Sequence, residues 1–304
     1  MFFRICLSIV FIIFLESPLH GQKYIGLSVD NDLYFGIDRY YSSGIFLQWG
    51  KLKTTEKDSL SNKVYKSKHW TIGQEINTPA FRLTEELVKM DYPYNGWLYL
   101  RFTSEQFFSP DQGYGWGVQI GTTGAEASLA KFFQNTYHIH ILNLEPLTWT
   151  WSIPQAFHLN INASYLWGAS LGNKFKWVNR NDIQGGTFRT SVKTRFGLQY
   201  GSLSGLPFFG NRMEKRQEGI SIFLGMEVEY NIHDYSLSSN WFNDKGQGPY
   251  ELVANDFRNK FQLGIVYNTK SWSIHAMLNN SSRHITTQKY SRHPFINISL
   301  NYIF

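Results

Sequence analysis

The stretch Phe157–Trp167 reads FHLNINASYLW, and from Phe157 to Tyr165 its side chains alternate between apolar and polar. Apolar residues occupy the odd positions from 157 to 167, whereas polar residues occupy positions 158, 160, 162 and 164. Successive side chains of a β-strand point to opposite faces, so this period of two predicts a strand with one apolar and one polar face. A run of about ten residues has the length of a tilted strand that crosses a membrane.

The same alternation recurs along the chain. It is clear at 188–199, at 220–231 and again at the C-terminus. A soluble β-sandwich would alternate too, but its strands are usually shorter. We therefore predict an all-β fold, a transmembrane antiparallel β-barrel of about twelve strands, an even number as single-chain bacterial barrels have. The expected strands are 23–31, 43–53, 68–77, 93–103, 113–122, 156–168, 173–180, 186–199, 217–231, 256–268, 271–281 and 294–304.

The last residues strengthen this prediction. Ile296, Ile298, Leu300 and Tyr302 alternate with polar residues at 297, 299 and 301, and the chain ends on Phe304. This ending resembles the terminal strand by which outer-membrane barrels are recognised for assembly.

Composition agrees with a barrel and excludes a helical membrane protein. The 304 residues include 24 Phe, 18 Tyr, 10 Trp and 25 Gly, yet the mean hydropathy is only −0.31. Beyond the first residues no window approaches 18 consecutive apolar residues, which a membrane-spanning helix would need. A barrel with an apolar outer band and a polar lumen explains both the many aromatic residues and the low mean hydropathy. Aromatic residues near strand ends are expected to form interfacial girdles.

The first 21 residues have the pattern of a secretory signal. Arg4 precedes an apolar stretch at 5–15, and small or turn-forming residues follow before Gln22. We predict a signal peptide at 1–21 and a single outer-membrane barrel at 22–304. The only cysteine, Cys6, lies in the signal, so we expect no thiol chemistry in the barrel.

The lengths of the connections suggest an orientation. If both ends of the barrel chain lie in the periplasm, every odd-numbered connection faces the outside, and most of these connections are long. They are 32–42, 78–92, 123–155, 181–185, 232–255 and 282–293. Long outer loops and short inner turns are typical of such barrels. Two inner connections, 54–67 and 200–216, are longer than this pattern predicts. The lysine-rich segment 51–68 is interpreted as a solvated turn, with a partner site as the alternative.

Polar residues gather on the predicted outer rim. Asn31, Asp32 and Ser42 belong to the first outer connection, where Asp38 is expected to make loop salt bridges or hydrogen bonds. A helix is predicted at 125–138, and it carries Gln134 and His138 four residues apart, so that both project from one face.

These segments resemble a known family, the outer-membrane lipid A 3'-O-deacylases. The resemblance lies in Asp30-Asn31-Asp32, in Tyr41-Ser42-Ser43-Gly44, in the segment 91–99 (DYPYNGWLY), and in Gln134 with His138. Their order and spacing agree over nearly the whole mature chain. Asp30 stands where the family has Glu, and Tyr92 stands where Arg is common, which leaves a phosphate contact in doubt.

The resemblance implies an ester hydrolase that removes the 3'-acyloxyacyl chain of lipid A and requires Ca²⁺. By the same resemblance His138 would be the general base, Asp32 would orient it or help hold the metal, and Asn31, Ser42 and Gln134 would complete the site. Glu145 is a second tentative metal contact. The residue types suit these roles, because His is the usual base near neutral pH and carboxylate oxygens suit Ca²⁺. The partners implied are lipopolysaccharide and the outer membrane, with the site at the extracellular rim.

Two other functions remain open from the sequence. Ser42 could be the nucleophile of an outer-membrane phospholipase, although no third member of a triad is assignable. The chain could also be a non-catalytic barrel, either a pore or an adhesin. No nucleic-acid motif is present.

Overall fold

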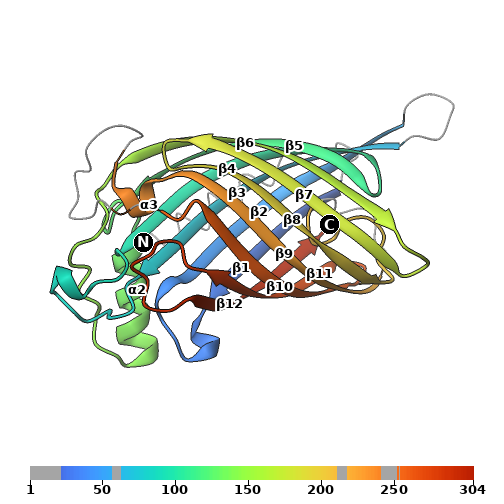
Figure 1. Cartoon of the computed structure of the whole chain (residues 1–304). Helices are drawn as coiled ribbons and strands as arrows, with labels where there is room; N and C mark the ends of the chain where they lie inside the picture. Colours follow the sequence, from blue (N-terminus) through green and yellow to red (C-terminus); the bar gives the residue numbers. More distant parts are fainter. Residues whose placement is uncertain (1–21, 57–62, 211–217, 241–251, 253) are drawn as a thin grey trace, which may run out of the picture.

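The computed structural model describes residues 22–56, 63–210, 218–240, 252 and 254–304. Twelve antiparallel strands close into one barrel in which each strand pairs with its neighbours in the chain, and the last strand pairs with the first (Figure 1). The strands are β1 (Gln22–Asn31), β2 (Tyr40–Glu56), β3 (Lys63–Thr78), β4 (Asn95–Ser109), β5 (Gln112–Thr123), β6 (Phe157–Ser170), β7 (Phe175–Gly186), β8 (Arg189–Gly201), β9 (Gly219–Asp234), β10 (Phe257–Asn268), β11 (Trp272–Ser282) and β12 (Arg292–Ile303).

The predicted fold class, strand number and strand order are therefore confirmed. Closure joins β1 to β12 over eight residue pairs, from Tyr24 opposite Ile303 to Asn31 opposite Ile296. Closing the sheet leaves no strand edge unpaired, which is a condition for a β-structure in hydrocarbon. Among the described residues, no helix is long and apolar enough to cross a membrane. The predicted signal at 1–21 lies outside the described residues.

Short helical segments occupy the connections. They are η1 (Leu33–Phe35), η2 (Leu87–Lys89), α2 (Ala130–Tyr137), η3 (His138–Leu142) and α3 (Tyr235–Ser238). The helix predicted at 125–138 begins later than expected, because Leu129 has a left-handed backbone with φ of 59° and cannot continue a helix. It also continues further, since η3 adds a π-helical turn.

The two faces of the wall differ as the alternation predicts. On β6, Leu159 and Ile161 are exposed on the outside, whereas His158 and Asn160 are buried inside. Aromatic side chains form an outer girdle near the end of the barrel that holds the C-terminus. Its exposed members are Tyr114, Trp116, Tyr165, Phe175, Tyr200, Tyr267, Trp272 and Tyr302.

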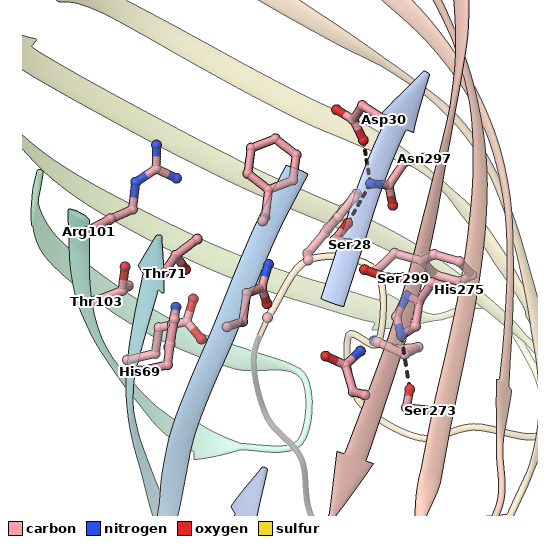
Figure 2. A pocket seen from close by; sticks show the side chains of 18 of the residues that line it. Ser28, Asp30, His69, Thr71, Arg101, Thr103, Ser273, His275, Asn297 and Ser299 are labelled. Carbon is pink, nitrogen blue, oxygen red and sulfur yellow. Dashed lines mark hydrogen bonds between the residues drawn. The ribbon is translucent and has the colours of Figure 1, made fainter. Parts of the chain in front are cut away.

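The interior is polar in the middle. A cavity of about 560 Å³ lies there, with side chains such as Asp30, His69, Thr71 and Arg101 directed into it (Figure 2). Elsewhere in the lumen buried charges are paired, for example Arg195 with Glu227 at 3.0 Å and Arg258 with Asp234 at 2.8 Å. Pairing is what makes buried charge tolerable in an interior of low polarity.

An apolar plug lies inside the lumen at its inner end. The segment 203–209 after β8 folds back into the barrel, where Phe208 and Phe209 pack on Phe223 from β9. Further apolar side chains around this segment are Phe107, Leu166, Val178 and Val266. The long inner connection at 200–216, which did not fit the expected pattern of short turns, thus contributes residues that fill the bore.

Candidate functional site

The first outer connection folds tightly around Asp32. Its backbone N–H donates to the carbonyl of Ser42 at 3.2 Å, and its carboxylate Oδ2 accepts the backbone N–H of Arg39 at 3.0 Å. The side chain of Asn31 accepts the backbone N–H of Leu33 at 2.6 Å. These bonds turn the chain back after β1, so that Asp38 and Asp32 come close together at the mouth of the barrel.

The helix α2 is seated on the outside of the barrel wall. A Cβ atom at Gly96 in β4 would lie 2.2 Å from the Cβ of Ala130 and 2.0 Å from Oγ of Ser128, so only glycine allows the helix to come this close. The amide of Asn135 donates to the carbonyl of Leu147 at 3.0 Å and accepts its N–H at 2.8 Å. The helix is thus attached at both sides, and α2 and the β1–β2 connection lie at the same end of the barrel (Figure 1).

This seating brings His138 against the first connection. Its Nε2 lies 3.0 Å from Oδ2 of Asp38, and both side chains are almost completely buried. The same Oδ2 atom lies 3.1 Å from the guanidinium of Arg82. The other ring nitrogen of His138, Nδ1, is buried without a hydrogen-bond partner. An imidazole that donates from Nε2 to a carboxylate keeps its lone pair on Nδ1, and that is the arrangement of a general base.

Asp38 is a correction to the sequence interpretation. We expected Asp32 to orient His138 or to help hold the metal, and Asp38 to make loop contacts, but the carboxylate that touches His138 belongs to Asp38. Asp38 does also bridge to Arg82, so the expected loop salt bridge exists beside its contact with the imidazole. The signal that could have found it is its own position, a second acid six residues after Asp32 in a loop rich in polar residues.

Asp32 lies beside this pair in a different environment. It is completely buried, its Oδ1 has no partner, and its Oδ2 lies 3.8 Å from Nε2 of His293. Burial raises the pKa of Asp32 to about 9, and the nearby charge of Asp38 adds to this, although the N–H of Arg39 works in the opposite direction. A cation, or a proton, on Oδ1 would relieve the cost of a buried, unpartnered carboxylate.

The other predicted site residues lie in different environments. Gln134 lies one turn before His138, is buried, and has an Oε1 without a partner. Ser42 is buried at a β-bulge in β2, and within the described residues its hydroxyl makes no hydrogen bond with a histidine. Asn31 is used by the turn that follows β1. Glu145, the second tentative metal contact, is exposed to solvent.

The remaining outer connections support this rim. The carboxylate of Asp91 accepts the hydroxyl of Tyr40 at 2.6 Å and the backbone N–H groups of Ala80 and Lys289, both at 2.9 Å. It therefore ties three connections together. Tyr94 donates to the carbonyl of Arg82 and stacks on Trp149 with ring centroids 5.0 Å apart. The segment 91–99 singled out in the sequence is thus a scaffold for Arg82 and the loops around it.

A calcium ion would find a partial set of ligands here. Oδ1 of Asp32 and Oε1 of Gln134 are buried oxygens without partners, the hard donors that Ca²⁺ prefers. However, the described residues contain no group of three or more His, Cys, Asp or Glu side chains that could hold a metal ion. Because six to eight oxygens are usual for Ca²⁺, these side chains alone do not make a complete site.

The cavity in the lumen is separate from this rim. The 560 Å³ cavity in the lumen is lined by none of His138, Asp32, Ser42 and Gln134. The candidate site is at the rim, where the buried pair of His138 and Asp38 lies near the unpartnered Oδ1 of Asp32.

Comparison with known proteins agrees with the fold. The family model described as "Outer membrane protein LpxR" matches residues 2–304. Among solved structures, LpxR from Salmonella typhimurium matches with a TM-score of 0.74 at 17% identity, covering 92% of this chain and 100% of that one. Lower similarity is found to an outer-membrane channel from Pseudomonas putida (TM-score 0.48, 10% identity, 95% and 97% covered) and to the β domain of the Bordetella autotransporter Brka (TM-score 0.47, 7% identity, 93% and 98% covered). A search among curated proteins found no match.

Proposed function

Because the chain belongs to the LpxR family of outer-membrane proteins, we propose that it is a lipid A deacylase that hydrolyses the ester at the 3' position, with His138 activating water. The observation that carries this proposal is the buried pair of His138 and Asp38, whose atoms Nε2 and Oδ2 are 3.0 Å apart at the mouth of the barrel. It is the arrangement of a base and its orienting acid.

The chemistry can be written from these residues. The carboxylate of Asp38 accepts a hydrogen bond from the Nε2–H group of His138 and so leaves Nδ1 free to take a proton from water. The hydroxide that results adds to the ester carbonyl, and the bond between that carbon and the 3' oxygen of the sugar then breaks. The imidazolium returns its proton to the departing oxygen, so that a free sugar hydroxyl and a carboxylic acid are formed. The carboxylate of Asp38 stabilises the imidazolium between these steps.

The outer surface of the helix supports access from the membrane. Apolar side chains that are exposed on α2 and just after it are Phe132, Phe133, Tyr137, Ile139, Ile141 and Leu144. Such a face is costly in water but suits the acyl chains of a lipid leaflet. A lipid ester could therefore approach His138 sideways, with its acyl chains remaining among apolar groups.

We further propose that the activity requires Ca²⁺ and that the carboxylate of Asp32 is one of the ligands of the ion. A bound cation of this kind stabilises the negative charge that develops on the carbonyl oxygen. The ligands found here are incomplete, so no step above depends on the ion.

Substitution of the base tests the proposal. We expect His138→Asn to abolish release of the 3'-acyloxyacyl chain, measured by mass spectrometry of lipid A from cells that make the variant. Heat-modifiable migration in gels checks that the barrel is folded, and His140→Asn, an exposed histidine two residues away, is the matched control. Normal release by His138→Asn would refute the assignment.

The alternatives receive less support. The Ser42 phospholipase lacks a histidine bonded to its nucleophile among the described residues, and it predicts cleavage of glycerophospholipids by the purified protein. The pore conflicts with the plug at 203–209, which occupies the inner end of the bore.

A further inference from the structure

The lipid-facing side of β2 and β3 ends in lysines at the periplasmic end. On β2 the outward residues Ile45 and Leu47 are followed by Trp49 and then by Lys51 and Lys53. On β3 the corresponding series is Ile72, Trp70, Lys68 and Lys66. The alternate residues Gln48 and Thr71 line the lumen cavity, so these lysines are on the outer face of the wall. All four are exposed.

The pairing of the strands concentrates this charge. Trp49 is directly opposite Trp70, Lys51 is opposite Lys68, and Lys53 is opposite Lys66. Lys23 on β1 is opposite Lys51 on its other side. Like charges directly opposite each other destabilise a sheet. Among the described side chains, none of the four lysines on β2 and β3 forms a salt bridge with a carboxylate, so no described neighbour offsets this cost.

Their depth matches the headgroup layer of the inner leaflet. Trp49 and Trp70 follow the apolar band, at the level where aromatic residues meet the membrane interface. Lys51 and Lys53 are two and four residues further, roughly 7 and 13 Å along the strand before its tilt is taken into account. Lysine stems can lie along apolar surface while the ammonium group reaches the phosphates.

We propose that Lys51, Lys53, Lys66 and Lys68 form a binding surface for the phosphate groups of anionic phospholipids in the periplasmic leaflet. Four ammonium groups on one outward face, immediately beyond an interfacial tryptophan pair, fit negatively charged headgroups that already lie at that depth. The lipid phosphates supply the counter-charge that the sheet lacks. This inference is independent of the deacylase proposal, because the lysines are at the opposite end of the barrel from His138.

Lipid selectivity of the purified barrel tests this surface. The protein is reconstituted in nanodiscs of phosphatidylethanolamine with about 20% phosphatidylglycerol, a mixture in which electrostatic attraction to the anionic lipid is measurable. The lipids that the protein retains are counted by native mass spectrometry. We expect the natural protein to retain the anionic lipid preferentially and the preference to fall with added salt. Lys51→Gln with Lys68→Gln should lower the preference roughly tenfold, whereas Lys51→Arg with Lys68→Arg should keep it.

A matched control removes the same charge elsewhere at the same end. Lys174 and Lys270 are exposed in the inner turns after β6 and β10 and lie outside the lysine pairs. Lys174→Gln with Lys270→Gln should leave the preference unchanged. The proposal is overturned if the natural protein shows no preference, or if both double variants lose it equally. Should the first double variant fail to fold, Lys53→Gln with Lys66→Gln tests the second row of the same surface.

A different occupant would give a different result. If the lysine substitutions abolish binding to purified peptidoglycan but leave lipid selectivity unchanged, the surface faces the cell wall and the lipid proposal is wrong.

Discussion

Replacing Asp38 by Asn gives the sharpest test of the rim site. The substitution keeps the size of the side chain and removes the charge that lies 3.0 Å from Nε2 of His138. A hydrogen bond to a charged group contributes about 1.5–3 kcal/mol, which alone corresponds to a roughly 10- to 150-fold lower rate. The amide can also donate to Nε2 and so move the ring proton to Nδ1, the nitrogen that must accept a proton from water. In serine proteases the equivalent change lowers kcat by about 10⁴. We expect a fall between these limits.

The assay must separate a positioning role from a structural one. Initial rates of fatty-acyl release from lipid A in detergent micelles, measured from about pH 5 to about pH 9 so that the range includes the usual pKa of a histidine side chain, give kcat, KM and the pH profile. For Asp38→Asn we expect a lower kcat with little change in KM, and an altered acid limb of the profile. Glu126→Asn is the control, because this exposed acid lies in the connection that carries His138 and, among the described residues, forms its ion pair with Lys131. A variant at Asp38 with natural kcat and pH profile would refute the reasoning.

Other expectations follow from the helix seat, the metal, the plug and the core. Gly96→Ala should displace α2 from the wall and lower the deacylation rate by on the order of tenfold, while Gly185→Ala, whose Cβ meets nothing within 4 Å, should not. EGTA should abolish turnover by the purified protein and added Ca²⁺ should restore it; undiminished turnover would remove calcium from the mechanism. The natural protein should show no conductance steps in planar bilayers, and stable open channels would contradict a plugged lumen. Phe209→Ala should destabilise the barrel by about 3–5 kcal/mol in urea unfolding, whereas the exposed Phe132→Ala should change little.

Local pattern was sufficient for the wall of the barrel. The alternation at Phe157–Trp167 depends only on the pleat of one strand, so it can be read without knowing what the strand pairs with. The same holds for the C-terminal run to Phe304 and for the resemblance that singled out Gln134 and His138, because these residues are near each other in the chain. The parity of the connections then placed the polar segments at one end, as the structure does.

Contacts between distant parts of the chain needed the tertiary structure. Asp38 and His138 are separated by four strands, and only closure of the barrel and seating of α2 at Gly96 bring them to 3.0 Å. Local composition predicted only loop contacts for Asp38, and it was the family resemblance that favoured Asp32 as the orienting acid or a metal contact. The plug also needed the tertiary structure. The 200–216 connection is longer than the expected inner turns, but its length did not predict that Phe208 and Phe209 enter the lumen.

One physical cause explains which features followed from the sequence and which required the tertiary structure. Side-chain direction along a strand is a property of neighbouring residues, and the sequence by itself therefore determined the barrel, its strand number and the membrane-facing side of each strand. Which acid reaches the imidazole, which segment fills the bore and which lysines face each other depend on register and packing between segments far apart in the chain. Those were decided only when the twelve strands closed.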